Sequence, residues 1–383
     1  MGDVKKTVAM IGNPTSNKGR GAVISEQVFD MLSTAGLRHG FDVIDLTGSS
    51  FDDSLHAARA HSDLYDALVV VGGDGMIALG ANAVCETGKP LGVVAMGSGN
   101  DFARGLHLPV NRVRTAVEGI VGAIVCGTSI DVDMGHVRSL DGNAALRSGS
   151  DARGKLVHEK LAHKKFAREG GLKAPFIDRF YAGMLNCGLD ASINDRANKS
   201  RLPGGSIRYA AAVLVELTHM KRYGYHIKAV LADGSVDERD IISPLVTVAN
   251  ARYIGGGIEV SPYSLLSDGM LDLVWIDHMP SLSECAVALS NAYNGKLLSS
   301  RVFGWERVRR IEITRADDGD EPPVLMADGE YIGRIPVEID AASMSLRVLV
   351  PPAVVEWHKR RTQEHVTAAI VRDGRDPLTG RFV

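Results

Sequence analysis

The sequence has no long hydrophobic run and few cysteines. Its longest apolar run, residues 210–217, is far shorter than the roughly 20 residues that a membrane-spanning helix needs. The four cysteines are scattered along the chain, with neither the spacing of a metal site nor the density of a disulfide framework. These absences argue against a helical membrane protein and a disulfide-rich secreted domain, and we expect four reduced thiols in a cytoplasmic protein.

The sequence also has no excess of positive charge, and we expect no signal peptide. The net charge of −3 argues against a dedicated nucleic-acid binder. Residues 1–6 lead directly into a predicted strand, without the apolar segment of a signal peptide. At 383 residues, 45% of them hydrophobic and 23% charged, the chain has the composition of a globular protein with room for two domains.

A glycine-rich turn at residues 72–75, Gly-Gly-Asp-Gly, is the first chemical signal. It follows an apolar run at residues 67–71, which predicts a strand buried on both faces, and precedes a predicted helix over residues 76–84. Such a turn presents unpaired N–H groups and the positive end of a helix dipole, an arrangement that binds phosphate. Without a ligand the same pattern describes an ordinary strand–helix turn, so this segment alone leaves both interpretations open.

A second polar loop follows the next predicted strand, residues 91–95. In a parallel sheet both loops lie at the carboxyl edge, where open α/β folds bind ligands. Gly97 and Gly99 permit close approach of the backbone to a ligand. Polar groups are offered beside them by Ser98, Asn100, Asp101 and Arg104.

These two motifs, Gly-Gly-Asp-Gly at 72–75 and Gly-x-Gly-Asn-Asp-Phe-Ala-Arg at 97–104, resemble the catalytic domain of diacylglycerol kinases. The family includes soluble bacterial lipid kinases and is related to sphingosine and ceramide kinases. The first motif also occurs in NAD kinases and phosphofructokinases, whereas the second is much more specific. Segments at 250–262 and 265–273 resemble the C-terminal half of the family, so the resemblance extends from about residue 7 to about residue 352.

Strand–helix alternation over residues 7–125 predicts a doubly wound α/β domain, and alternating hydrophobic residues thereafter predict antiparallel sheet. The resemblance implies a fold like that of NAD kinases and phosphofructokinases for the first domain and a β-sandwich for the second. We therefore divide the chain into a nucleotide-binding domain, residues 1–130 completed by part of 340–383, and a lipid-substrate domain, residues 131–339.

An insertion at residues 139–175 interrupts the second domain. The composition of its first part predicts loop, and six lysines and arginines follow within residues 153–168. They either contact an anionic membrane surface or form a solvated surface insertion, and we favour the second interpretation. Further on, a helix is predicted over residues 202–225, a final hairpin over 336–350, and a tail or edge helix beyond 352.

The resemblance implies that three loops hold ATP. The third lies at residues 13–17, where Asn17 replaces the glycine usual in the family and tolerates similar backbone geometry. Thr47, at the end of the second strand, occupies a position near the nucleotide in the family, and Met76 replaces a usual threonine. The implied nucleotide-binding residues are Asn13, Pro14, Thr15, Ser16, Asn17, Thr47, Gly72, Gly73, Asp74, Gly75, Met76, Gly97, Ser98, Gly99, Asn100, Asp101 and Arg104.

A structural Mg²⁺ is also implied by the resemblance. Bacterial members hold it at an Asp-Gly turn through one carboxylate and two carbonyls, which by position are Asp268 and the carbonyls of Leu265 and Met270. Oxygen ligands of this kind suit Mg²⁺. Asp133, in an Asp-x-Gly segment, is a further carboxylate suited to direct or water-mediated metal contact. The Asp-Gly dipeptide by itself equally indicates a simple hairpin turn.

Transfer of a phosphoryl group to a hydroxyl benefits from a base that accepts the hydroxyl proton. The family uses the glutamate of a late Asp-Gly-Glu motif, which here is Glu330. Asp74 is expected to be the second catalytic carboxylate, suited to metal contact. An isolated Asp-Gly-Glu indicates a surface turn, but the other motifs in their proper order favour the catalytic interpretation.

The most favoured function is an ATP- and Mg²⁺-dependent lipid kinase that converts diacylglycerol to phosphatidic acid. A long-chain base, ceramide or phosphatidylglycerol is an alternative acceptor. An NAD kinase fits the block at 100–104 poorly, and the presence of Asp74, Asp268 and Glu330 argues against a regulator without catalysis. A lipid substrate implies peripheral contact with the inner face of the membrane, and the sequence leaves a homodimer open.

Overall fold

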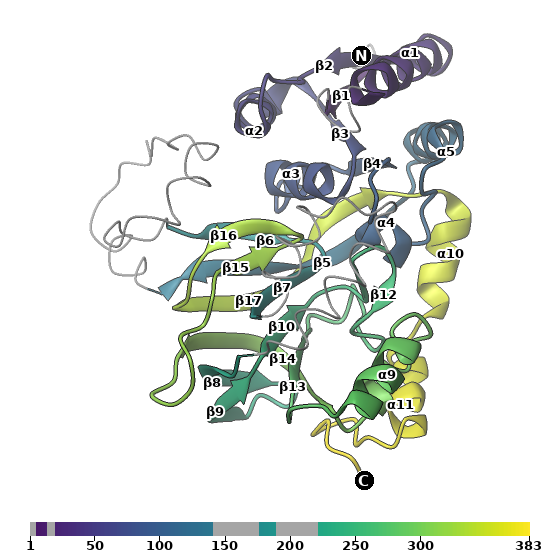
Figure 1. Cartoon of the computed structure of the whole chain (residues 1–383). Coiled ribbons are helices and arrows are strands. Elements are labelled where there is room, and N and C mark those ends of the chain that lie inside the picture. The colour runs from purple at the N-terminus through teal and green to yellow at the C-terminus, as the bar shows by residue number, and fades with distance from the viewer. Residues whose placement is uncertain (1–4, 14–19, 141–175, 189–220) are drawn as a thin grey trace.

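The computed structural model describes residues 5–13, 20–140, 176–188 and 221–383 (Figure 1). Within these residues one mixed sheet runs through the whole molecule, and two short strands, β11 (Tyr253–Ile254) and β12 (Ile258–Glu259), pair separately. None of the helices in this part of the chain is long and apolar enough to cross a membrane.

The N-terminal half is a parallel sheet with helices on both faces. In chain order its elements are β1 (Lys6–Gly12), α1 (Arg20–His39), β2 (Phe41–Asp45), α2 (Phe51–Ala60), a 3₁₀ turn (Ser62–Leu64), β3 (Ala67–Gly72), α3 (Asp74–Val84), β4 (Leu91–Ala95), α4 (Asp101–Gly105) and α5 (Val113–Cys126). The strand order is β2-β1-β3-β4. One face packs against α1 and α5 and the other against α2 and α3, so β3 is buried along its whole length.

Helix α3 begins two residues earlier than the sequence indicates. It starts at Asp74 rather than Met76, with Gly73 as its N-cap. Asp74 therefore lies in the first turn, where a carboxylate is stabilised by the helix dipole. All residues from Met76 to Val84 are buried, and this apolar helix fixes the glycine turn to the core.

The C-terminal half is built of antiparallel strands. They are β5 (Ser129–Ser139), β6 (Asp178–Tyr181), β7 (Met184–Gly188), β8 (Tyr223–Leu231), β9 (Val236–Ser243), β10 (Leu245–Ala249), β13 (Leu271–Ile276), β14 (Phe303–Arg315), β15 (Leu325–Ala327), β16 (Glu330–Gly333) and β17 (Val337–Leu349). The main path runs β16-β15-β7-β10-β13-β14-β17, with β8 joined to β14 and β9 to β8. Residues such as Ile227, Val248 and Ile311 are fully buried and belong to the hydrophobic core of this half.

Strand β17 connects the two halves. Near its start it pairs antiparallel with β14, and near its end Val348 pairs parallel with Leu91 of β4. Both parts pair antiparallel with β5. The predicted final hairpin is therefore wrong, because its two segments form one strand along a single partner, with an irregularity between Ala342 and Leu346.

Further helices follow in the C-terminal half. They are α9 (Leu282–Asn291), a 3₁₀ turn (Leu297–Ser299), α10 (Pro352–Arg360) and α11 (Gln363–Arg372). The last two helices occupy the region predicted as a tail or edge helix. Val366 and Ile370 of α11 are buried beside Tyr263 and Trp305. This helix is therefore amphipathic, although the composition of the region is mostly charged.

Two predicted features fall mostly outside the described residues. The structure describes residues 139–140 of the insertion at 139–175, and the remainder lies outside the described ranges. The predicted helix over 202–225 lies outside them as far as residue 220. Its predicted end is wrong, because Tyr223 begins strand β8 and the polypeptide is extended from there.

Candidate active site

The carboxylate of Asp74 joins the two glycine-rich loops. Its Oδ2 accepts a hydrogen bond from the backbone N–H of Asn100 at 2.8 Å, and its Oδ1 accepts one from Asp101 at 2.9 Å. The first turn of α3 therefore holds the first turn of α4. The structure thus brings the Gly-Gly-Asp-Gly and Asn-Asp-Phe-Ala-Arg motifs into direct contact at the carboxyl edge of the parallel strands.

Two glycines make this contact sterically feasible. A Cβ at Gly97 would lie 2.5 Å from the Cα of Gly73, and a Cβ at Gly73 would lie 3.0 Å from the Cα of Gly97. Asn100, fully buried, completes the second loop in a left-handed conformation with φ 55°. Its side chain accepts from Gly97 N at 2.7 Å and donates to Gly97 O at 2.8 Å, which closes the turn without a ligand.

Burial shapes the electrostatics of these loops. It raises the pKa of Asp74, and the N–H groups of Asn100 and Asp101 oppose the rise. Burial also raises the pKa of Asp101 to about 6, against the N–H of Gly256, which donates to Oδ2 at 3.0 Å. The other oxygen of Asp101 and Nε of Arg104, 3.9 Å apart, are buried without a hydrogen-bond partner among the described residues. They form an ion pair with each other, and the side chain of Arg104 is 40% exposed, so the rest of its guanidinium can contact a polar ligand.

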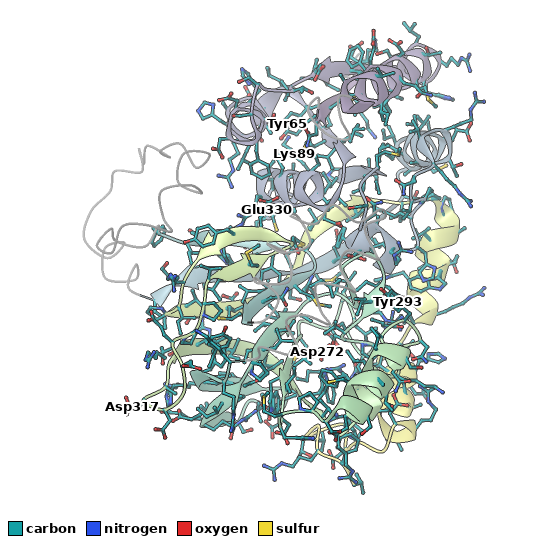
Figure 2. All side chains as sticks on the ribbon, in the orientation of Figure 1. Tyr65, Lys89, Asp272, Tyr293, Asp317 and Glu330 are labelled. Carbon is teal, nitrogen blue, oxygen red and sulfur yellow. The ribbon has the colours of Figure 1, made fainter. Side chains whose placement is uncertain are left out.

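Glu330 reaches the first glycine loop from the other half of the molecule. It is exposed and begins β16, directly after the two-residue turn Asp328–Gly329. This turn has φ values of 49° and 82°, the left-handed pair that a tight type I′ hairpin requires. A side chain at Gly75 would place its Cβ 3.5 Å from Oε1 of Glu330. Figure 2 shows Glu330 beside α3, where the two halves meet.

Asp328 holds this hairpin in place. Its Oδ2 accepts from Ala182 N at 2.7 Å, and its Oδ1 accepts from Gly183 N at 2.7 Å and Met184 N at 3.2 Å. Burial raises the pKa of Asp328 to about 6; these N–H groups oppose the rise, and the nearby charge of Asp74 adds to it. Asp328 therefore positions Glu330 through the connection between β6 and β7.

Asp328→Ala is expected to lower the free energy of unfolding by about 2–4 kcal/mol, because backbone N–H groups of Ala182, Gly183 and Met184 lose their acceptor. Urea unfolding measures this loss. Asp328→Asn keeps one acceptor oxygen and is expected to lose less. An unchanged unfolding free energy for Asp328→Ala would contradict the anchoring role.

The predicted nucleotide-binding loop at residues 13–17 is described only at Asn13. Thr47 Oγ1 accepts from Gly12 N at 2.9 Å, which ties the end of β2 to the end of β1. A Cβ at Gly72 would lie 3.8 Å from the Cβ of Asn13, so Asn13 is beside the glycine turn. Met76 packs inward against Gly72 and is part of the core. The remaining predicted residues of this loop, Pro14, Thr15, Ser16 and Asn17, lie outside the described residues.

The residues of the predicted metal site form a separate cluster. Both oxygens of Asp133 accept backbone N–H groups, from Gly269 at 2.6 Å and from Met344 at 2.7 Å. Asp268 Oδ1 accepts from Met270 N at 3.1 Å, whereas its buried Oδ2 has no hydrogen-bond partner in the described part of the chain and lies 3.5 Å from Nη1 of Arg307. Among the described residues no hydrogen bond or ion pair links this cluster to Asp74 or Glu330.

The Oδ2 of Asp268 is buried, accepts no hydrogen bond among the described residues and has Arg307 as its ion-pair partner, so it has lone pairs that a cation could use. Burial raises the pKa of Asp268 to about 7, Arg307 opposes the rise, and Asp272 and Asp133 add to it. The described residues contain no group of three or more His, Cys, Asp or Glu side chains arranged around one point. A bound ion would therefore need backbone carbonyls, as predicted for Leu265 and Met270, and water, which is the ligand set that Mg²⁺ accepts.

One segment near the site was not assigned a role from the sequence. Gly256 donates its N–H to Asp101, and a Cβ at Gly256 would lie 3.4 Å from the carbonyl oxygen of Ser98. A Cβ at Gly257 would lie 3.6 Å from Nε of Arg104. The three consecutive glycines at 255–257 were the available signal, because such a run permits backbone to approach backbone.

Two family models match the chain, and both agree with the observed architecture. The "Diacylglycerol kinase catalytic domain" matches residues 7–137, and the "YegS C-terminal NAD kinase beta sandwich-like domain" matches residues 183–350. A solved diacylglycerol kinase structure from Bacillus anthracis strain Sterne has a TM-score of 0.58 at 17% identity, covering 92% of this chain and 100% of that one. At this identity the match shows the fold alone, and it confirms the predicted fold class.

Curated relatives have similar length and low identity. The diacylglycerol kinase of Mycobacterium tuberculosis H37Rv is 26% identical over 349 residues, covering 90% of this chain and 95% of the relative. The diacylglycerol kinase of Bacillus subtilis 168 is 23% identical over 355 residues, covering 92% and 98%. The similarity therefore spans both halves of the molecule.

Proposed function

We propose that this chain, which belongs to the diacylglycerol kinase catalytic-domain family, is a lipid kinase that transfers the γ-phosphate of ATP to a lipid hydroxyl. The observation that carries the proposal is the position of the Glu330 carboxylate beside Gly75. This glycine lies in the first turn of α3. A phosphate-binding turn and a carboxylate base are the two parts that phosphoryl transfer to a hydroxyl needs in one place.

In the proposed reaction the lipid oxygen attacks the γ-phosphorus, its proton passes to Glu330, and ADP leaves with the electrons of the broken P–O bond. The backbone N–H groups around Gly73 and Gly75 and the guanidinium of Arg104 bind the phosphates. Asp74 keeps the two loops together, and its carboxylate would help to hold the Mg²⁺ that accompanies ATP. Mg²⁺ bound with ATP supplies positive charge to the phosphate oxygens as charge develops there.

Diacylglycerol is the proposed acceptor, and phosphatidic acid the product. The names of the relatives support this choice, since both relatives above are called diacylglycerol kinases. A long-chain base, ceramide or phosphatidylglycerol is the alternative acceptor. Because such substrates reside in a bilayer, we propose that the protein works at the inner face of the membrane through peripheral contact.

An assay with radiolabelled ATP and Mg²⁺ tests the proposal. Diacylglycerol, ceramide, a long-chain base and phosphatidylglycerol are offered separately in mixed micelles, with NAD as a water-soluble acceptor. Label in phosphatidic acid is the expected result. Label in another lipid would support lipid kinase activity but identify a different acceptor. Label in NAD alone, or in no acceptor, would overturn the proposal.

Mg²⁺ is expected to raise the melting temperature of the wild type and EDTA to lower it, because an ion bound only by the native state adds stability by mass action. Asp268→Ala is expected to abolish this response, since it removes the carboxylate of the proposed Asp-Gly turn site. Asp233→Ala, which removes a carboxylate from an exposed turn, is the matched control and should respond as the wild type does. A wild type that melts identically with Mg²⁺ and with EDTA would contradict the site.

A further inference from the structure

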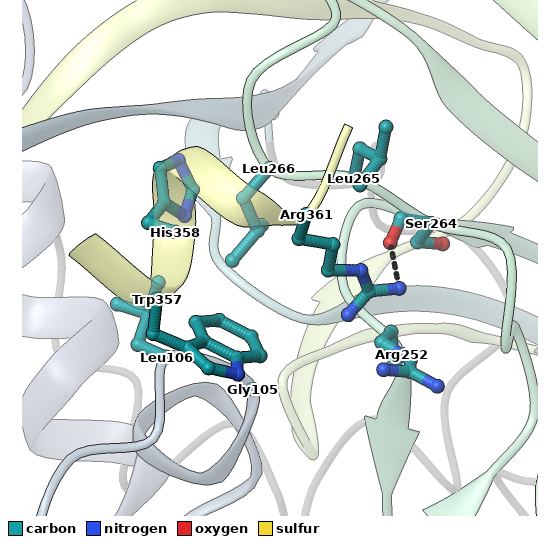
Figure 3. Close-up of a pocket in the computed structure, with 9 residues that line it drawn as sticks. All are labelled: Gly105, Leu106, Arg252, Ser264, Leu265, Leu266, Trp357, His358 and Arg361. Carbon is teal, nitrogen blue, oxygen red and sulfur yellow. Dashed lines mark hydrogen bonds between the residues drawn. The ribbon is translucent and has the colours of Figure 1, made fainter. Parts of the chain in front are cut away.

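A pocket lies beside the C-terminal end of α4 (Figure 3). It is bounded by the C-terminal end of α4, the segment 264–266 and helix α10. Leu106 and Trp357 form an apolar wall, and Arg252, His358 and Arg361 supply basic groups. None of the described residues that line it is acidic.

Of the two arginines of this pocket, Arg252 is paired with a carboxylate, and among the described residues Arg361 is not. Nη2 of Arg252 is paired with Glu259, while its Nε is buried and has no hydrogen-bond partner in the described part of the chain. Nη2 of Arg361 donates to the carbonyls of Ser264 at 3.0 Å and Pro262 at 3.3 Å. No carboxylate of the described residues lies within salt-bridge distance of Arg361. One guanidinium charge is therefore left without a counter-charge.

The positive charges crowd one another. Burial lowers the pKa of Arg361 to about 10, and the neighbouring Arg252 lowers it further. Burial also lowers the pKa of His107 and of His358, and Arg361 adds to both effects. Uncompensated cations that are partly buried cost stability, and an anion placed between them would relieve this cost.

Part of the pocket lies outside the regions that the family models match. Trp357, His358 and Arg361 come after residue 350, where the second matched region ends. Helix α10 brings them against α4, and the ring of Trp357 lies 3.8 Å from that of His107. A C-terminal segment therefore completes the pocket, and this segment contributes no residue to the glycine loops or to the turn that carries Glu330.

We propose that this pocket binds a phosphate monoester, with the phosphate between Arg252 and Arg361 and its organic part against Trp357 and Leu106. Planar guanidinium groups match the oxygens of a phosphate, and the charge of Arg361, which has no counter-charge among the described residues, adds to the attraction. The phosphate belongs either to a water-soluble metabolite or to the head of a lipid. An occupant would also contact Arg252, which precedes by four residues the Gly256 whose N–H donates to Asp101.

Titration of the full-length protein tests this proposal, without ATP or acceptor so that kinase activity plays no part. Isothermal calorimetry compares inorganic phosphate, glycerol 3-phosphate and monomeric short-chain phosphatidic acid, with phosphatidylcholine of the same chain length as a phosphodiester control. The wild type is expected to bind the monoesters saturably and the diester weakly. Equal affinity for glycerol 3-phosphate and phosphatidic acid would identify a soluble ligand, and tighter binding of phosphatidic acid would identify a lipid.

Arg361→Gln is expected to weaken monoester binding at least about tenfold, because a charge-assisted hydrogen bond is lost. Arg361→Lys keeps the charge and most of the packing. Its affinity for the monoesters should lie between those of the wild type and of Arg361→Gln. Arg360→Gln is the matched control, since Arg360 is exposed and does not line the pocket. Thermal melting establishes that each variant is folded.

Phosphate can also bind at the glycine loops. The binding is therefore assigned to this pocket only if its affinity depends on Arg361. Folded Arg361→Gln with wild-type affinity would overturn the proposal. Absence of saturable binding of all three phosphate probes by the wild type would also overturn it.

Discussion

Glu330→Gln is expected to lower kcat for lipid phosphorylation by roughly 10²–10⁴-fold, the range of a general-base contribution. The substitution keeps the shape of the side chain and removes the group that accepts the proton. The fold should be unaffected, because Glu330 is exposed and no described residue pairs with its carboxylate. Affinity for ATP should be unchanged, because the proposed phosphate contacts come from the glycine turn.

Two measurements separate a base from a nucleotide contact. Nucleotide affinity is measured by titration in the absence of lipid, and kcat is measured at saturating ATP. Asp74→Asn is the contrasting variant, expected to change both quantities, because Asp74 holds the loop around Asn100. If Glu330→Gln weakened ATP binding but kept turnover at saturation, the base would have to be sought among Asp74, Asp101 and Asp133.

Gly97→Ala is expected to lower kcat/KM for ATP at least about 100-fold, because small displacements of a catalytic site have effects of this size. The added Cβ would lie 2.5 Å from the Cα of Gly73 and 2.9 Å from Oδ1 of Asn100. The first of these atoms is backbone, so the two loops must separate. The free energy of unfolding should fall by about 1–3 kcal/mol, as for other overpacked sites.

Gly122→Ala is the matched control for this substitution. Gly122 lies inside α5, and a Cβ there would meet no atom within 4 Å. Alanine in a helix interior is expected to stabilise the protein by about 0.5–1 kcal/mol relative to glycine, with activity unchanged. Wild-type kinetics for Gly97→Ala would show that the contact between the loops is not needed.

The parallel half of the fold could be predicted from the sequence because its signals are local. Residues 67–71 are apolar without interruption, and this pattern in a short segment indicates a strand covered on both faces. Gly72 and Gly97 mark where the strands end. The contact of Asp74 with Asn100 then follows from topology, since consecutive parallel strands end at the same edge.

Other features depend on partners distant in the sequence. Nothing local at Glu330 indicates that it lies beside Gly75; only the resemblance to a family suggested the pairing. The sequence predicts a hairpin of two segments, 336–339 and 344–350, and pairing of both segments with β5 makes them one strand instead. Beyond residue 352 the sequence predicts only a tail or edge helix, because the apolar residues of the buried stripe of α11, Val366 and Ile370 among them, find their partners elsewhere in the fold.

Strand β17 has a consequence for how the protein is made. Leu91 of β4 obtains its outer neighbour, Val348, only when most of the chain has left the ribosome. Until then the edge of β4 has unpaired N–H and C=O groups, which can form hydrogen bonds with another nascent chain. The nucleotide-binding half, although it is translated first, is therefore completed last.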